Sequence, residues 1–150
     1  MRRRAASPWL LSGLLGGASV LHFVTPDSYA AIVPRALGNP RAWVFGSGVV
    51  ELACAVAVAL PSSRRRGALV SAALFVAVFP ANLQMALDAD ASKPGLANNP
   101  LLAYGRLPLQ VPLVLWALAV ARAAARADAP APAPRAGDGR IRTHSGTGGV

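Results

Sequence analysis

Long apolar stretches alternate with short polar segments along the first 126 residues of the chain. Four of these stretches have the roughly 17 to 25 residues that a helix needs to cross the hydrocarbon core of a bilayer. They lie at about residues 8–24, 40–60, 67–87 and 107–124. The pattern predicts an all-α protein, a four-helix transmembrane bundle whose first partner is the lipid bilayer.

Turn residues mark the limits of the spans. Ser7 and Asn39 each precede a proline, and an N-cap residue followed by proline at the first helical position is typical of a helix start. We assign Lys93 to Gly95 and Asn98 to Pro100 to the loop before the fourth span. These signals fix the starts of the first two spans at Pro8 and Pro40.

Prolines also occur inside two of the predicted spans. Pro80 cannot donate the helical hydrogen bond to the Val76 carbonyl, and Pro112 cannot donate the bond to Pro108. Both prolines should therefore bend their helices. In a membrane, such bends are tolerated where neighbouring groups or water satisfy the freed carbonyl.

Basic residues predict the orientation, because they stay on the cytoplasmic side during insertion. Eleven of the fifteen lie at the two termini or between the second and third spans, and the other four are Arg35, Arg41, Lys93 and Arg106. Both termini are therefore expected in the cytoplasm. An alternative takes residues 1–30 as a secretory signal peptide, since Arg2 to Arg4 form an n-region and Ser28 to Ala30 resembles a cleavage site.

Composition supports a membrane protein and excludes other classes. Hydrophobic residues make up 54% of the chain and charged residues 14%. The net charge of +9 does not indicate nucleic-acid binding, because aromatic residues do not interleave with the arginines. Cys54 is the only cysteine, which excludes dithiol chemistry within the chain. We therefore divide the chain into a membrane domain at 1–126 and a disordered cytoplasmic tail, rich in Ala, Pro and Gly, at 127–150.

Polar side chains within the spans form the candidate site. Ionisable and amide groups at membrane depth are costly, so each should be paired, hydrated or functional. Side chains lean toward the N-terminus of their own helix, which predicts that those of the first three spans converge in the outer half of the bilayer. We expect Gln84, about 200° from its neighbour Asn82 around the helix, at the membrane interface instead. The members of this polar cluster are His22, Glu51, Asn82, Arg106 and Gln110.

Two interpretations of the cluster stay open. Glu51 is the only glutamate, and its buried charge needs a proton or a hydrogen-bond partner. It could act in a proton relay or anchor the polar head of a ligand. The polar residues could instead lock helices together through interhelical hydrogen bonds. Pairs of small residues, Gly13 with Gly17 and Gly46 with Gly48, should in addition mark close helix contacts.

Several short motifs occur in order along the four spans, and together they resemble the DoxX-like family of bacterial integral membrane proteins over about residues 10–118. The resemblance implies a four-helix bundle in the bacterial cytoplasmic membrane and a link to a quinone cofactor. It implies no dithiol role, because Cys54 has no partner cysteine. The motifs are Leu21 to Val24, Ser47-Gly48 with Glu51, Val78 to Asn82, and Arg106 to Gln110.

The resemblance favours an accessory or quinone-linked subunit of a membrane redox system, with a redox protein as partner. The residues themselves allow two alternatives. One is a carrier for a small polar molecule that uses Glu51 and forms a homo-oligomer to complete its pathway. The other is a structural or assembly role. No catalytic residue, metal site or stand-alone enzymatic activity is predicted.

Overall fold

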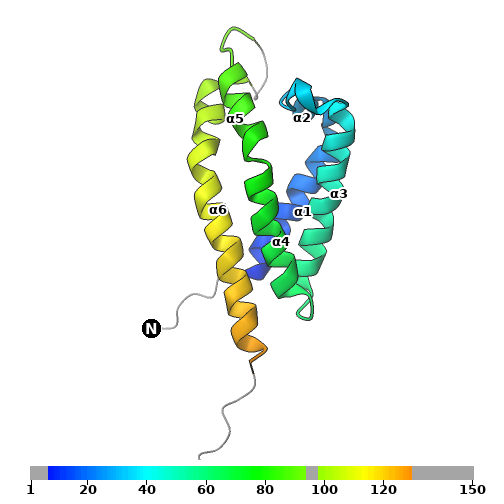
Figure 1. The fold of residues 1–150 in the computed structure, drawn as a ribbon, viewed down its shortest axis with the longest axis vertical. Coiled ribbons are helices and arrows are strands. Elements are labelled where there is room, and N and C mark those ends of the chain that lie inside the picture. The colour runs from blue at the N-terminus through cyan, green and yellow to red at the C-terminus, as the bar shows by residue number, and fades with distance from the viewer. Residues whose placement is uncertain (1–6, 94–97, 130–150) are drawn as a thin grey trace, which may run out of the picture.

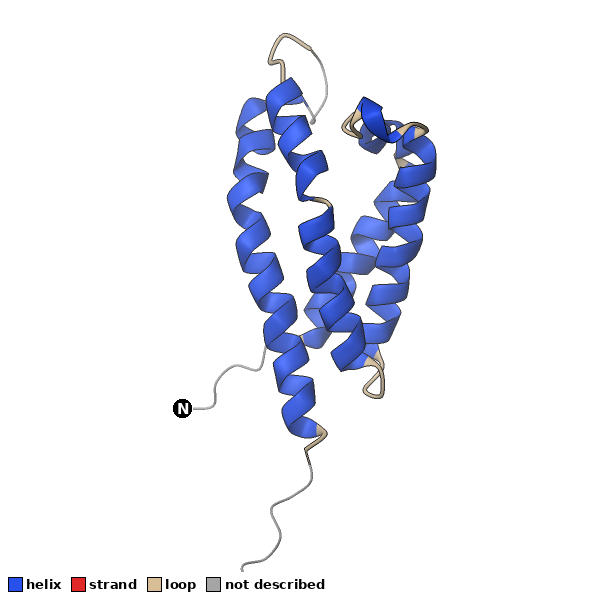
Figure 2. Ribbon diagram, in the orientation of Figure 1, coloured by secondary structure: helices blue, strands red, loops and turns tan. Residues whose placement is uncertain are grey.

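The structure, a computed structural model, describes residues 7–93 and 98–129, and within these ranges it contains helices and no strand (Figure 2). The prediction of an all-helical fold is confirmed. The predicted tail beyond residue 129 and the first arginine cluster lie outside the described residues. The helices are α1 (Pro8–Val24), α2 (Pro26–Ala30), α3 (Pro40–Ala59), α4 (Arg64–Ala77), α5 (Phe79–Asp88) and α6 (Pro100–Ala127), with a 3-10 turn, η1 (Arg35–Leu37), before α3.

Three helices begin with the same local device, a capping side chain followed by proline. The Ser7 hydroxyl accepts from the Leu10 N–H, and the Asn39 amide oxygen accepts from the Arg41 N–H at 3.1 Å. The Asn99 amide oxygen does the same for Leu101 at 3.0 Å. Helices begin at Pro8 and Pro40, as the cap-and-proline signals predicted, and the Asn99 cap begins α6 at Pro100, seven residues before the predicted start of the fourth span.

The third span is interrupted at its middle. Val78 separates α4 from α5, and Pro80 is the second residue of α5. Prolines are well tolerated in a first helical turn, because the N–H groups there have no partner within the helix. The expected bend at Pro80 is thus a break between two helices. Pro112, in contrast, lies inside α6, which runs unbroken from Pro100 to Ala127.

The lengths of the helices indicate a membrane protein. Three segments are long and apolar enough to cross a bilayer: α3, the α4–α5 segment over Arg64–Asp88, and α6. No more than 33% of the apolar window in each is buried, so most of these apolar residues face outward. At 17 residues α1 is shorter, with a length of about 26 Å against a hydrocarbon core of about 30 Å.

The helices pack as two neighbouring groups (Figure 1). Helix α1 lies along α3, α6 lies along α4 and α5, and contacts between α3 and α4 join the groups. The start of α1, the end of α6 and the α3–α4 connection lie at one end of the molecule, which we call the α3–α4 end. Helix α2 and the start of α6 lie at the opposite end, which we call the α2 end.

Close packing is concentrated at the α3–α4 end. There α1, α3, α4 and α6 all contribute to one core cluster, which includes Leu11, Leu15, Val58, Phe75 and Val120. The cluster toward the α2 end contains only buried residues from α5 and α6, namely Met85, Ala86 and Ala103. Ile32, which follows α2, packs against this second cluster, so the larger shared core lies at the α3–α4 end and only a smaller apolar contact joins the groups at the α2 end.

A glycine permits the closest helix contact at the α3–α4 end. A Cβ atom at Gly67 would lie 2.7 Å from the Ala57 Cβ and 2.8 Å from the Val58 backbone nitrogen. The Arg64 guanidinium strengthens this junction by donating to the Val58 and Ala59 carbonyls at 2.9 and 2.8 Å. Small residues allow close approach of helix backbones where no hydrophobic difference from lipid drives association.

Not every glycine predicted at a helix contact lies at one. A Cβ at Gly48 would meet the His22 Cβ at 3.0 Å, which confirms a close contact there. A Cβ at Gly13, Gly17 or Gly46 would have nothing within 4 Å, so the prediction of close contacts at these three is wrong within this chain. The spacing of small residues alone does not reveal which side of a helix faces a neighbour.

Replacing Gly67 by alanine should destabilise the protein. The added methyl group would overlap the backbone of α3, and overpacking of this kind typically costs about 1 to 3 kcal/mol. Thermal unfolding of the purified protein in detergent measures the loss. Gly17→Ala is the matched control, since its methyl group enters open space and alanine favours a helix. Equal stability of the two variants would contradict the α3–α4 contact.

Candidate functional site

The five predicted site residues form two separate polar groups and one isolated cation. His22 of α1 and Glu51 of α3 form the first group, the acid–imidazole pair. Asn82 of α5 and Gln110 of α6 form the second, the amide pair. Asn82 was predicted to converge with His22 and Glu51, but the structure pairs it with Gln110. In the part of the chain that the structure describes, no hydrogen bond or ion pair joins the two groups.

Gly48 brings His22 close to Glu51. A Cβ at Gly48 would lie 3.0 Å from the His22 Cβ, so a larger residue would push α1 away by a few tenths of an ångström at this height. At the same height, the Ser19 hydroxyl of α1 donates to the Gly48 carbonyl of α3 at 2.8 Å and holds the two helices together. Glu51 follows Gly48 by three residues, almost one helical turn, and therefore faces α1 as well.

The acid–imidazole pair is buried and incompletely hydrogen-bonded. His22 and Glu51 are 9% and 8% exposed, and the His22 Nδ1 lies 3.1 Å from the Glu51 Oε2. The same nitrogen lies 2.8 Å from the Ala18 carbonyl, to which it donates when protonated. Oε2 has no hydrogen-bond partner in the structure. A buried charged carboxylate without a donor is costly by several kcal/mol, so Glu51 requires a proton, an imidazolium or a ligand cation.

One proton can occupy either member of this pair. On His22 Nδ1 it bonds to the Ala18 carbonyl beside a charged Glu51. On Glu51 Oε2 it can be donated to the bare Nδ1, which is then an acceptor at 3.1 Å. When Nε2 also carries a proton, the first arrangement is an ion pair and the second is a neutral pair. The geometry is therefore suited to taking up and releasing a proton.

Tyr29 of α2 covers the pair. Its ring stacks on the His22 ring with centroids 4.1 Å apart and planes at 24°. An ion pair of 2.8 Å between Asp27 and Arg41 ties α2 to the start of α3. The sequence analysis did not identify Tyr29 as a site residue. Its spacing of seven from His22, two turns of a helix, was the available signal.

Burial and two charged residues set the pKa of Tyr29. Burial raises the pKa of the Tyr29 phenol, and the negative charge of Glu51 raises it further. The positive charge of Arg106 on α6 acts in the opposite direction on the same pKa. Tyr29 thus lies within electrostatic reach of an acid on α3 and a base on α6.

The amide pair holds the break in the third span. Asn82 donates to the Gln110 side-chain oxygen at 2.9 Å, and the Gln110 side-chain nitrogen donates to the Phe75 carbonyl. Phe75 belongs to the last turn of α4, where carbonyl groups lack partners within the helix. Both amides are therefore used in joining α4, α5 and α6. Gln84 bonds instead to Asp88 at 2.8 Å in an exposed pair, as expected for an interfacial position.

Arg106 is exposed and weakly bound. Its guanidinium contacts the Met85 sulfur at 3.7 Å, and thioether sulfur is a weak acceptor. No carboxylate of the described residues forms an ion pair with it. It lies in the second turn of α6 rather than at the start of the fourth span, because α6 begins at Pro100.

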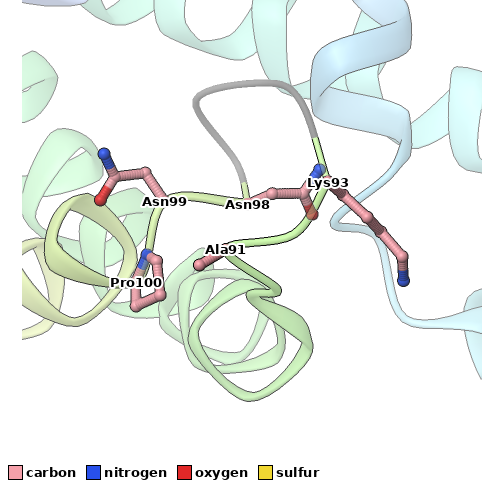
Figure 3. Close-up of a pocket in the computed structure, with 5 residues that line it drawn as sticks. All are labelled: Ala91, Lys93, Asn98, Asn99 and Pro100. Atoms are coloured by element: carbon pink, nitrogen blue, oxygen red, sulfur yellow. The ribbon is translucent and has the colours of Figure 1, made fainter.

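Two shallow hollows on the surface do not include the acid–imidazole pair. One, of about 270 Å³, lies in the connection before α6 and is lined by Ala91, Lys93, Asn98, Asn99 and Pro100 (Figure 3). Lys93 points away from Asn99 and Pro100 there and pairs with Asp90 at 3.2 Å. The other follows the outward face of α3 from Val49 to Leu60 and is almost wholly apolar. Neither hollow offers convergent polar groups for a ligand.

The fold and the apolar surface define the class: an all-helical protein with three segments able to span a membrane. Within that class, the chain belongs to the family described as Domain of unknown function (DUF8561), whose sequence profile matches residues 11–121. The assignment to the DoxX-like family is therefore wrong. Its motifs were short combinations of Pro, Gly and polar residues that suit membrane helices in general. No curated protein and no solved structure matches the chain.

Replacing Gln110 by leucine should destabilise the fold. The change leaves the Phe75 carbonyl without its donor and Asn82 without its acceptor, and each buried unpaired group costs about 1 to 3 kcal/mol. Thermal unfolding in detergent is the measurement. Gln84→Leu serves as the control, since its bond to Asp88 is exposed. A Gln110 variant as stable as this control would show that the amide pair does not hold the break.

Proposed function

We propose that the chain is a four-span membrane carrier for a small polar molecule, with the acid–imidazole pair as its proton-exchanging site. The observation that carries this proposal is the buried Glu51 carboxyl, whose Oε2 lies 3.1 Å from the His22 Nδ1 and has no other donor among the described residues. That nitrogen also lies 2.8 Å from the Ala18 carbonyl, so it is shared between two acceptors. A carboxyl group used only to join helices would be expected to have its donors in place. A buried acid that lacks such donors is suited to reversible binding of a proton or a cationic group.

Four spans with both termini in the cytoplasm agree with the positions of the charges. In the proposal α1 crosses the bilayer together with α3, the α4–α5 segment and α6. The three consecutive arginines Arg64, Arg65 and Arg66 lie at the α3–α4 end, which is also where α1 begins and α6 ends. The positive-inside rule assigns this end to the cytoplasm. The acid–imidazole pair then belongs to the outer half of the bundle.

The charged and titratable groups around Glu51 favour exchange of its proton toward the α2 end. His22 faces it from α1, and the ring of Tyr29 on α2 stacks on the His22 ring. Cys54 is one turn further along α3 and is buried in the core. The core at the α3–α4 end is apolar, so a proton released from the pair would leave through the outer side.

The architecture also supports movement of the outer halves. Helices α1, α3, α4 and α6 share the large core at the α3–α4 end, only Ile32 packs on the α5–α6 cluster at the other end, and Val78 interrupts the third span near its middle. Broken helices near the bilayer midplane are common around the sites of membrane carriers. A change of angle at Val78 would open or close the α2 end while the shared core stays packed.

Two other functions, a quinone-linked redox role and a structural role, have less support from the residues of the site. A quinone-linked role in a redox system was implied only by the resemblance to the DoxX-like family, and no residue of the site requires it. A structural role has one specific observation in its favour: the hydrogen bonds of the amide pair join three helices. That role explains Asn82 and Gln110, but it leaves the unbonded acid of Glu51 without a reason.

Cysteine labelling tests the proposed orientation. Ser92 and Ser62 are exposed in connections at opposite ends, and Cys54→Ala removes the single native thiol. In intact cells a membrane-impermeant maleimide should label Ser92→Cys and leave Ser62→Cys unlabelled until the membrane is opened. Labelling of Ser62→Cys from outside would reverse the topology. Labelling of both from outside would show that the α4–α5 segment does not cross the membrane.

Proton movement tests the carrier. In proteoliposomes with a pH-sensitive dye inside, some members of a panel of small polar solutes should change the internal pH when added outside. Glu51→Gln should abolish this signal, because the amide cannot release a proton. Asp27→Asn is the matched control, since its carboxyl is exposed and pairs with Arg41. A wild-type protein that moves no protons with any solute, or a Glu51 variant that still does, would overturn the proposal.

A further inference from the structure

The apolar hollow on the outward face of α3, which we call the α3 groove, ends where a cluster of arginines begins. Its volume is about 530 Å³, and large exposed side chains lie next to the small Ala53 and Ala57 along it. The lining residues are Val49, Leu52, Ala53, Val56, Ala57, Leu60 and Ser63. A hydrocarbon chain suits such a surface, because it gains dispersion contacts there and needs no hydrogen bonds.

The length of the α3 groove matches one leaflet of a bilayer. From Val49 to Leu60 a helix rises about 16 Å, and half of a hydrocarbon core of about 30 Å is about 15 Å. One acyl chain of a lipid in the leaflet at the α3–α4 end therefore fits the length of the groove. A transmembrane helix of a second copy would instead be matched by a groove that continued through both leaflets.

Hydrogen bonds fold the α3–α4 connection onto the end of the groove. The Ser63 hydroxyl donates to the Ala57 carbonyl at 3.0 Å, which joins two of the lining residues. The Arg64 guanidinium donates to carbonyls at the end of α3. The Cα of Arg65 lies within about 8 Å of the Ser63 Cα, because consecutive Cα atoms are about 3.8 Å apart. The groove and the arginines that follow it are therefore parts of one surface.

The charge at this end of the groove is positive. Arg65 and Arg66 are exposed, and neither the connection at residues 60–63 nor the first turn of α4 contains an acidic residue. The helix dipole also favours negative charge at the start of a helix, and α4 carries only cations there. An anionic head group at the bilayer surface is therefore favoured, by about fivefold for each arginine close to it.

We propose that the α3 groove binds one anionic phospholipid of the leaflet at the α3–α4 end. One acyl chain lies along the groove between Val49 and Leu60, and the phosphate accepts hydrogen bonds from Arg65 and Arg66. The bound lipid joins α3 to the start of α4, at the end where the helices share their large core. The inference does not depend on the proposed carrier function, since the acid–imidazole pair takes no part in it.

Native mass spectrometry of the full chain tests the lipid. The protein is released from mixtures of phosphatidylglycerol and phosphatidylcholine with identical acyl chains, so that only the net charge of the head group and its substituent differ. The wild-type chain should retain one phosphatidylglycerol, with a preference of about tenfold or more over phosphatidylcholine, since two arginines each contribute about fivefold. Equal retention of the two lipids would overturn the proposal.

A pair of charge variants tests the head-group contacts. The double variant Arg65→Gln and Arg66→Gln should lower the preference for phosphatidylglycerol about tenfold or more. The matched control is Arg122→Gln with Arg126→Gln, which removes two exposed cations from the last turns of α6, a helix that packs along α4 and α5. Thermal unfolding confirms that each variant is folded. An equal loss of preference in both double variants would show diffuse attraction to the membrane surface and would overturn the proposal.

A second pair of variants tests the groove itself. Ala53→Leu fills the groove without a change of charge and should lower the retained phosphatidylglycerol severalfold. Ala123→Leu adds the same volume on the outward side of α6 and should leave the retained lipid unchanged. Both alanines are exposed, so neither substitution overpacks the core.

The remaining outcomes separate the lipid from other occupants and from the carrier function. If Ala53→Leu leaves lipid retention unchanged but converts a dimer into a monomer, the groove is a contact between two copies of the chain and the proposal is wrong. Glu51→Gln should leave the lipid preference unchanged. A loss of preference in that variant would place the lipid at the acid–imidazole pair and would also overturn the proposal.

Discussion

The α2 end of this protein depends on one constraint, an acid buried beside an imidazole with too few hydrogen-bond donors. Gly48 lets α1 and α3 come close where Glu51 meets His22, and the Tyr29 ring stacks on the His22 ring. Burial makes an unpaired carboxylate costly, so the charge of Glu51 has to be matched by a proton, by His22 or by a ligand. These three states differ in which partner compensates the Glu51 charge. Exchange among them is the physical basis of the proposed function.

The uneven packing of the helices gives this exchange its direction. The shared core, the Gly67 contact and the Arg64 bonds keep the α3–α4 end together. Toward the α2 end only Ile32 packs on the α5–α6 cluster from the other helix group, and the amide pair joins only α4, α5 and α6. The larger apolar core therefore lies in one half of the molecule, and the polar pairs lie in the other. Lipid faces most of the remaining apolar surface, which explains why so little of each span is buried.

The sequence predicted the helical fold, two helix starts and the residues of both polar groups, because cap-and-proline signals and polar residues in apolar runs are local features. It did not predict their partners. Asn82 turns to Gln110 rather than to Glu51, since the break at Val78 exposes the Phe75 carbonyl to α6. The sequence analysis placed Asn99 in a loop because polar residues and a glycine lie just before it. Asn39 and Asn99 nevertheless share one helix-start signal, an asparagine cap followed by proline. Tyr29 was missed because its role depends on where α2 folds back, and short motifs suggested the wrong family.

The most direct test of the account is nitrogen-15 NMR of the imidazoles in lipid bilayers. The chain has two histidines, His22 and His144, so His144→Gln leaves a single signal to follow with pH. The account predicts that the Nδ1 of His22 changes between donor and acceptor with pH, and that Glu51→Gln alters this titration while Asp27→Asn does not. A His22 signal whose titration is identical with and without the Glu51 carboxyl would contradict a shared proton, and with it the proposed site.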